Sequence, residues 1–108
     1  MQGFKAAWLY EASFRQELTI LAVLFPFSIW IAQNVMQWIA MVAAALLVLT
    51  TELMNSAMEA AVDRHGQEKH ELSGRAKDFG SAAVFVSMLI FGMIWGAVLI
   101  NRFFFEIL

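Results

Sequence analysis

The chain has 108 residues, of which 61% are hydrophobic and 15% are charged, with a formal net charge of −2 and no cysteine. Its length allows one domain, and a soluble domain of this size cannot bury so much apolar surface, so the composition favours a membrane protein. The lack of cysteine excludes disulfides and thiolate metal sites. No basic tract suggests nucleic acid as a partner.

The first 16 residues are predicted to form an amphipathic helix on the membrane surface. At about 100° per residue, Phe4, Trp8 and Phe14 fall on one apolar face, and a helix of this kind lies in the membrane interface. Glu11 falls within that face, so its carboxylate needs a partner. The partner is either Arg15, one helical turn further along, or a ligand held against the neighbouring helices.

Two long uncharged runs follow this segment. Charged residues are absent from Leu18 to Thr51 and again from Phe79 to Asn101. A transmembrane helix needs roughly 20 apolar residues, so the second run holds one helix, and the first can hold two short helices with a turn at Gln33-Asn34. The sequence therefore predicts an all-α membrane protein, with one domain over residues 1–108. Its expected elements are the surface helix at 1–16, transmembrane helices at 17–32, 35–62 and 74–102, and a loop at 63–73.

Lysine and arginine are distributed unevenly about these three helices. Six of the seven lie in the first segment or in the loop, and only Arg102 lies on the other side. Segments rich in these residues stay in the cytoplasm, so the charged side is predicted to be cytoplasmic. The six residues are Lys5, Arg15, Arg64, Lys69, Arg75 and Lys77.

The second transmembrane segment ends in a stripe of polar side chains, in the stretch TTELMNSAMEAAVD at residues 50–63. Counted at about 1.5 Å per residue from Val35, Glu52 lies roughly 25 Å along the helix, near the inner edge of a hydrocarbon core of about 30 Å. Glu59 lies two turns nearer the cytoplasm. The stripe consists of Glu52, Asn55, Ser56, Glu59 and Asp63.

A carboxylate at that depth is costly unless it is paired or faces protein or water. Glu52, at the hydrocarbon edge, is suited to take a proton from a lipid hydroxyl. Glu59 can bind a hard cation, since Mg²⁺ takes one or two protein carboxylates together with phosphate oxygens. Glu11 can supply the second carboxylate if the surface helix packs nearby. The alternative is that the stripe only pairs helices within a bundle.

The loop and the start of the last helix, DRHGQEKHELSGRAKD, form the one strongly polar stretch. Ser73 is a favoured N-cap, and a helix N-terminus near a cation such as Lys77 suits phosphate, although no P-loop motif is present. A solvated turn explains the same residues. Three thin helices cannot easily enclose a nucleotide and a lipid, so a homo-oligomer with shared sites is expected, and the Gly92–Gly96 pair permits close helix contact.

Three stretches carry a resemblance to a known family. EASFRQE, ELMNSAMEAAVDR and HELSGRAKDFGSAAV occur in this order, and they closely resemble the bacterial integral-membrane diacylglycerol kinases over nearly the whole chain. The resemblance implies a homotrimer in the bacterial inner membrane, with its active site facing the cytoplasm. It further implies that the γ-phosphate of ATP, with Mg²⁺ as cofactor, is transferred to diacylglycerol to give phosphatidic acid.

The resemblance also implies roles for individual residues. Glu52 matches the catalytic base, and Asn55 matches the polar residue beside it. Glu11 and Glu59 match the magnesium ligands, which also contact the nucleotide. The other implied nucleotide-binding residues are Glu68, Lys69, His70, Lys77 and Asp78. The implied substrate-binding residues are Trp8, Ser13, Arg15, Gln16, Glu17, Trp30, Glu52 and Ser81.

The family usually has more residues before the surface helix, whereas Met1 stands only ten residues before Glu11. Contacts expected from that segment therefore fall outside this sequence. Three other functions remain open. An undecaprenol kinase shares the fold and the core motifs, a small ion- or proton-conducting membrane protein can line its path with such carboxylates, and a purely structural helix-packing subunit needs no chemistry.

Overall fold

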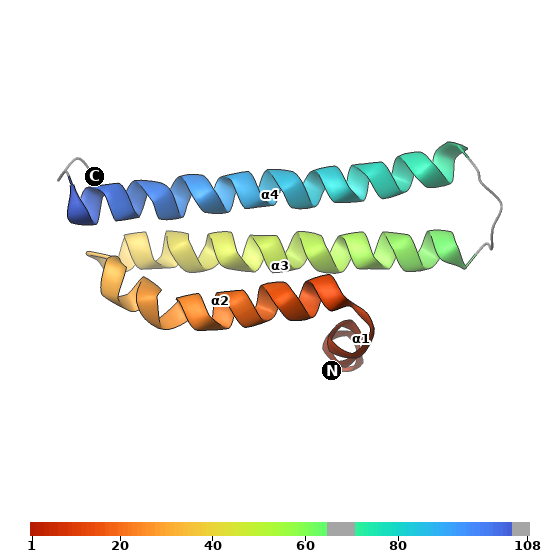
Figure 1. Cartoon of the computed structure of the whole chain (residues 1–108), viewed down its shortest axis with the longest axis horizontal. Helices are drawn as coiled ribbons and strands as arrows, with labels where there is room; N and C mark the ends of the chain where they lie inside the picture. Colours follow the sequence, from red (N-terminus) through yellow and green to blue (C-terminus); the bar gives the residue numbers. More distant parts are fainter. Residues whose placement is uncertain (65–70, 105–108) are drawn as a thin grey trace.

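The computed structural model describes residues 1–64 and 71–104, and within those ranges the chain forms four α-helices and no strand. They are α1 (Gln2–Tyr10), α2 (Ala12–Ile31), α3 (Val35–Asp63) and α4 (Glu71–Phe103). Figure 1 shows α2, α3 and α4 side by side with α3 in the middle, and α1 is seen end-on beside the start of α2. The predicted all-α fold is confirmed.

The three long helices α2, α3 and α4 are each long and apolar enough to cross a membrane. Many of their large apolar side chains point outward: Phe85 is 62% exposed and Met93 is 73% exposed. Such an outward apolar surface is unfavourable in water but is what lipid-facing helices need. The chain is therefore a multi-pass membrane protein, as its sequence predicts.

The turn between α2 and α3 is held by hydrogen bonds around Asn34. Its side-chain oxygen accepts from the backbone N–H of Gln37 at 2.8 Å, and the Gln37 side chain accepts from the backbone N–H of Gln33 at 3.0 Å. Asn34 is thus the N-cap of α3, and it satisfies an N–H group that the start of a helix leaves without a partner. The turn falls where the sequence predicts it.

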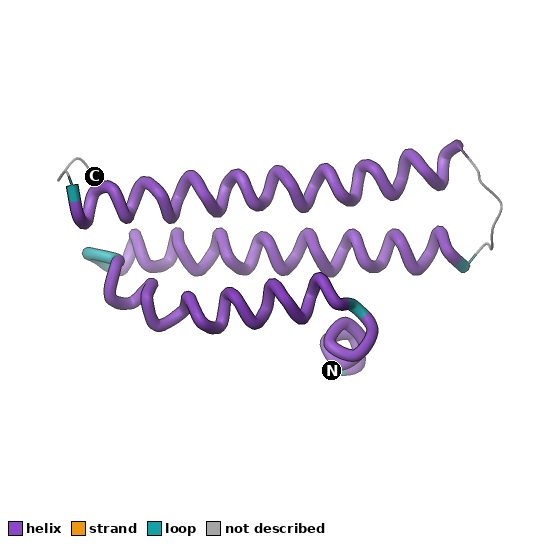
Figure 2. Tube along the Cα trace, viewed as in Figure 1, coloured by secondary structure: helices purple, strands orange, loops and turns teal. Residues whose placement is uncertain are grey.

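The first two helices meet at Glu11. Its backbone is extended, with φ −114° and ψ 104°, so that one helix ends before it and the next begins after it (Figure 2). The sequence predicted a surface helix up to residue 16. The helix ends earlier because the Arg15 guanidinium donates to the backbone carbonyls of Trp8 at 2.8 Å and Leu9 at 3.2 Å, which gives the last turn of α1 hydrogen-bond partners.

The last helix also differs from the prediction. Residues from Glu71 onward are already helical, so Ser73 lies inside the first described turn and is not an N-cap. In that turn Arg75 Nη2 lies 3.1 Å from Glu71 Oε1, and a pair of opposite charges four residues apart favours the helix. Helical structure therefore begins at least three residues before the expected start at residue 74.

The core lies where α4 packs on α3. Met41 is fully buried and Trp95 is 7% exposed. The Trp95 indole Nε1 donates to the backbone carbonyl of Met41 at 3.0 Å, and its ring stacks on Phe91 with 4.9 Å between centroids. A buried tryptophan with both partners fixes the register between the two helices. The core is completed by Ile31, Ala44 and Val98.

Polar contacts join the helices at two further levels. Thr51 Oγ1 of α3 and Ser87 Oγ of α4 lie 2.8 Å apart. At the other end of the bundle, the Asn101 amide nitrogen of α4 donates to the side-chain oxygen of Gln33, in the turn between α2 and α3. In a membrane such bonds contribute about 0.6 kcal/mol each on average, so they add specificity to a contact that is made mainly by packing.

Replacing Trp95 by Phe removes the hydrogen bond to Met41 while keeping an aromatic ring. Because that carbonyl keeps its partner within the helix, we expect a modest loss of about 1 kcal/mol in the free energy of unfolding. Unfolding of the protein in detergent micelles by added SDS, monitored by circular dichroism, measures this loss. Trp8→Phe, at a half-exposed ring, is the matched control. An equal shift in both variants would contradict the role given to the bond.

Candidate functional site

Glu52 is the buried centre of the polar stripe on α3. It is 6% exposed, and the preceding residue, Thr51, is hydrogen-bonded to Ser87 of α4. That contact fixes this part of α3 against α4. A carboxylate inside an apolar bundle is unfavourable unless other polar groups meet it. Those groups come from α2, from α3 itself and from the residue between α1 and α2.

Glu17 of α2 is the nearest partner of Glu52. The two carboxyl groups lie close together, and Glu17 Oε2 is buried without a donor among the described residues. A buried carboxyl group with another one beside it, at the edge of an apolar bundle, is suited to take a proton from a substrate.

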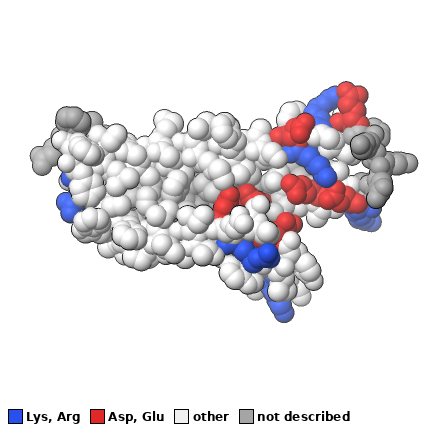
Figure 3. All heavy atoms as spheres, in the orientation of Figure 1, with Lys and Arg blue, Asp and Glu red and all other residues white. Residues whose placement is uncertain are grey.

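Asn55 orients Glu59, one helical turn further along α3. Asn55 Nδ2 donates to Glu59 Oε1 at 3.1 Å, and both side chains are half-buried. Glu59 and Glu11 also act electrostatically on Glu52. Figure 3 shows acidic side chains gathered toward the end that carries α1, beside the uncharged surface of the long helices. The four carboxylates of the site are Glu11, Glu17, Glu52 and Glu59.

Within residues 1–64 and 71–104 no group of three or more His, Asp or Glu side chains lies at metal-binding distances. Mg²⁺ commonly takes one or two carboxylates from a protein and completes its shell with phosphate and water, so Glu11 and Glu59 fit this ion by their chemistry. Asn55 adds to the fit. Its Nδ2 donates to Glu59 Oε1 at 3.1 Å, so it holds one of these two carboxylates in a fixed orientation.

A cavity of about 630 Å³ opens between α1 and α3. Its walls are mainly apolar, with Phe4 on one side and Leu53 on the other, and its polar side chains include those of Glu11 and Ser56. Ligand pockets usually have volumes of about 300–1,000 Å³ and combine apolar walls with a few polar groups. The cavity therefore suits a molecule with an apolar chain and a polar end.

Arg15 lines a second, shallower hollow. This hollow measures about 510 Å³ and brings Arg15 together with Trp8 and Gln16, which are three of the residues predicted to surround the lipid. Because the Arg15 guanidinium bonds to backbone carbonyls, it does not form the ion pair with Glu11 that the sequence allowed. In the described ranges the ion pairs are Arg75–Glu71 and Lys77–Asp63.

Lys77 joins the ends of α3 and α4 on the charged side of the molecule. Its Nζ lies 2.7 Å from Asp63 Oδ1, and Asp78 beside it is exposed. Lys77 therefore places a positive charge near the carboxylates of α3, where it can attract a phosphate group. Three other predicted nucleotide contacts, Glu68, Lys69 and His70, lie outside the described residues.

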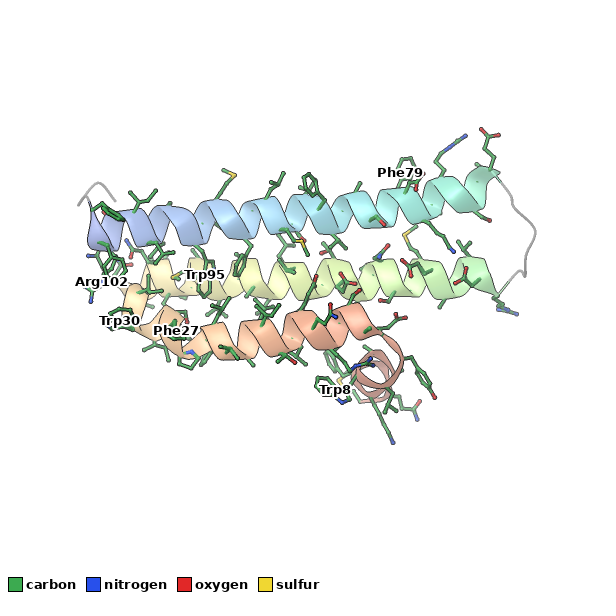
Figure 4. The ribbon with its side chains drawn as sticks, in the orientation of Figure 1. Trp8, Phe27, Trp30, Phe79, Trp95 and Arg102 are labelled. Atoms are coloured by element: carbon green, nitrogen blue, oxygen red, sulfur yellow. The ribbon has the colours of Figure 1, made fainter. Side chains whose placement is uncertain are left out.

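The remaining predicted lipid contacts are not gathered at one point. Ser13 and Ser81 are exposed on α2 and α4. Figure 4 shows Trp30 at the opposite end of α2 from Trp8, where its ring lies 5.6 Å from that of Phe103. Only an extended molecule lying along α2 can contact both tryptophans, so these residues remain predictions.

Two features of the site escaped the sequence reasoning. One is the contact of Glu17 with Glu52, which joins two different helices. The other is the packing of Gly80 of α4 against Asn55. A sequence signal for the second exists, because Gly80, Ser87 and Asn101 are spaced by multiples of seven residues and are all buried. Small or polar residues at that spacing indicate a helix face that packs on another helix.

Three membrane-length helices with a cluster of buried and half-buried carboxylates near one end define a membrane-embedded site. The family model described as "Prokaryotic diacylglycerol kinase" matches residues 1–99. Similar proteins named diacylglycerol kinase include that of Haemophilus influenzae, 46% identical over 92% of this chain and 84% of the relative. Those of Escherichia coli K12 and Pseudomonas aeruginosa PAO1 are 40% and 42% identical, each over 94% of this chain and over 84% and 82% of the relative.

The chain belongs to the prokaryotic diacylglycerol kinase family. The family expected from the sequence is confirmed, and the enzyme class, a diacylglycerol kinase, is confirmed with it.

Replacing Arg15 by Ala removes both hydrogen bonds that end α1. We expect α1 to become more mobile relative to α2, because its last carbonyls lose their donors. The chain has no cysteine, so a spin label attached at Gln2→Cys reports this motion by electron paramagnetic resonance. Lys5→Ala, on the same helix, is the control. The capping role predicts sharper spectra for Arg15→Ala alone and is wrong if both variants sharpen equally.

Proposed function

We propose that the chain transfers the γ-phosphate of Mg-ATP to the hydroxyl of diacylglycerol and so forms phosphatidic acid. The observation that carries this proposal is the buried carboxylate of Glu52, in contact with Glu17 and on the same helix face as Glu59. Relatives named diacylglycerol kinase support diacylglycerol rather than undecaprenol as the acceptor.

In this proposal Glu52 accepts the proton of the lipid hydroxyl. The hydroxyl oxygen bonds to the γ-phosphorus while the bond from that phosphorus to ADP breaks, and the hydroxyl proton passes to Glu52. Glu17 lies beside Glu52 and limits the orientation of its carboxyl group. Phosphoryl transfer depends on positioning and charge neutralisation more than on covalent chemistry, which suits a site built from carboxylates, an amide and a lysine.

Glu11 and Glu59 are the proposed magnesium ligands. When bound, Mg²⁺ neutralises negative charge on the ATP phosphates. Asn55 keeps the Glu59 carboxylate in one orientation through their 3.1 Å hydrogen bond, and Lys77 adds a positive charge where the nucleotide would arrive. The rest of the proposed nucleotide site consists of Asp78, Glu68, Lys69 and His70.

The acceptor lipid is proposed to lie along α1 and α2. The cavity between α1 and α3 offers apolar walls with Glu11 and Ser56 among its polar groups. The hollow around Arg15 is lined by residues of α1 and α2. An acyl chain that follows α2 from there would run toward Trp30. This placement explains why the predicted lipid contacts are spread along the molecule. The residues assigned to the lipid remain Trp8, Ser13, Arg15, Gln16, Glu17, Trp30, Glu52 and Ser81.

We place the protein in the bacterial inner membrane as a homotrimer whose site faces the cytoplasm. Six of its seven Lys and Arg residues lie on the proposed cytoplasmic side, in accord with the positive-inside rule. A single chain leaves the hollow beside Arg15 shallow and many apolar side chains exposed, so neighbouring subunits would help to enclose the substrates. Chemical crosslinking of the protein in micelles should yield a trimer as the largest product.

The acceptor is tested by offering radiolabelled ATP with diacylglycerol or with undecaprenol in mixed micelles. Label is expected in phosphatidic acid. Label found only in the polyprenol product would replace diacylglycerol by undecaprenol. ATP-independent ion flux in liposomes, without labelled lipid, would instead favour an ion- or proton-conducting protein.

Glu52→Gln removes the proposed base without changing the shape of the side chain. We expect turnover to fall by roughly 10²-fold or more, because general base catalysis contributes about 10²- to 10⁴-fold, while circular dichroism stays as in the wild type. Glu71→Gln, on the exposed surface of α4, is the control and should keep full turnover. Unchanged activity in Glu52→Gln would leave only a structural role for this carboxylate.

Glu59→Gln tests the proposed metal site. The variant keeps a side-chain oxygen but loses the charge that favours Mg²⁺, so we expect the KM for Mg-ATP to rise about tenfold, a loss of roughly 1.4 kcal/mol in binding, with a smaller change in kcat. Steady-state kinetics at several magnesium and ATP concentrations measures this. A defect that stays the same at saturating magnesium and ATP would contradict the ligand role.

A further inference from the structure

Gly80 lies on the face of α4 that packs against α3, and it is buried there. A Cβ added at this position would overlap Asn55 Oδ1. It would lie 3.2 Å from Asn55 Cγ and 3.5 Å from Asn55 Cα. The side chain of Asn55 therefore occupies the space that any other residue at position 80 would fill.

The other glycines of the described ranges behave differently. At Gly3, Gly74, Gly92 and Gly96 an added Cβ would meet nothing within 4 Å. Gly80 is therefore the place, within residues 1–64 and 71–104, where the lack of a side chain is required by a neighbour. That neighbour is Asn55, whose Nδ2 donates to Glu59 Oε1 at 3.1 Å.

The atoms that a methyl group would meet decide which part of the structure must move. The Asn55 amide is the end of a flexible side chain and can rotate away, whereas the contact with the backbone at 3.5 Å is an ordinary van der Waals distance. Alanine is also a better helix former than glycine, so α4 itself tolerates the change. The fold is preserved, and the amide is displaced whichever of its two polar atoms faces position 80.

We propose that Gly80 is a positioning residue for the phosphoryl-transfer site: its missing side chain makes room for the Asn55 amide, which in turn orients the Glu59 carboxylate. This proposal rests on the roles proposed above for Asn55 and Glu59. A methyl group at position 80 turns the amide out of its place and breaks its hydrogen bond to Glu59. Metal and nucleotide binding are then weakened indirectly, through Asn55 and Glu59.

The kinetic test is a cycle of Gly80→Ala, Asn55→Ala and the double variant. We expect Gly80→Ala to lower kcat/KM for Mg-ATP at least tenfold, mainly through KM. In the Asn55→Ala background the same change should cost less than twofold, because residues that act through one contact are not additive. If Gly80→Ala costs a further tenfold there, Gly80 acts through helix packing, and the proposal is overturned.

Gly74→Ala is the matched control, since it makes the same change on the same helix at an exposed position where the added Cβ meets nothing within 4 Å. It should keep the kcat/KM of the wild type. If Gly80→Ala also keeps that value, the amide is not held by Gly80 in the way proposed, and the inference fails although the kinase assignment stands.

A second measurement does not depend on activity. The chain contains three asparagines, Asn34, Asn55 and Asn101, so protein labelled with ¹⁵N-asparagine gives three pairs of side-chain amide signals, and Asn55→Ala identifies the pair from position 55. Gly80→Ala should shift that pair and leave the other two in place, whereas Gly74→Ala should shift none. An unmoved Asn55 signal in Gly80→Ala overturns the proposal. A protein without kinase activity whose Asn55 signal does move overturns the proposed function and keeps the contact.

Discussion

The close packing of α4 on α3 is the constraint on which the rest of the structure depends. At one level the Trp95 indole bonds to the Met41 carbonyl and fixes the register of the two helices. At another, Thr51 and Ser87 join them beside the acidic group, and Gly80 leaves room between them for the Asn55 side chain. These contacts prevent the two helices from rotating or sliding against each other. The carboxylates of α3 therefore keep fixed positions relative to the charged end of α4.

The membrane sets the remaining arrangement. The outward apolar side chains of α2, α3 and α4 are favourable in contact with lipid. The polar residues can therefore gather inside the bundle, where they contact one another rather than water. Glu52 is buried while Met93 is largely exposed, which reverses the order found in a soluble domain. For the proposed function, carboxylates concentrated at one end of the bundle would lie where an aqueous nucleotide and a membrane lipid can meet.

The sequence predicts the helices and the polar face of α3, because both depend on local pattern. Uncharged runs mark the transmembrane helices, Asn34 marks a turn, and the 3.6-residue period brings Glu52 and Glu59 onto one face. Contacts between segments are beyond such patterns. The end of α1 depends on Arg15 reaching back to the carbonyl of Trp8.

The roles of two further residues depend in the same way on how helices lie beside one another. Glu17 was assigned to the lipid, and its contact with Glu52 depends on how α2 lies against α3. The packing of Gly80 on Asn55 depends on the register between α3 and α4.

The extended backbone at Glu11 couples two tasks in one residue. Glu11 is the single residue between α1 and α2, and its side chain also lines the cavity between α1 and α3. A ligand that holds this carboxylate therefore also limits the angle between the two helices and the shape of the cavity wall. In the proposed kinase, ATP and the acceptor lipid would then bind cooperatively. Each substrate would already restrict the motion of α1 that the other has to restrict on binding.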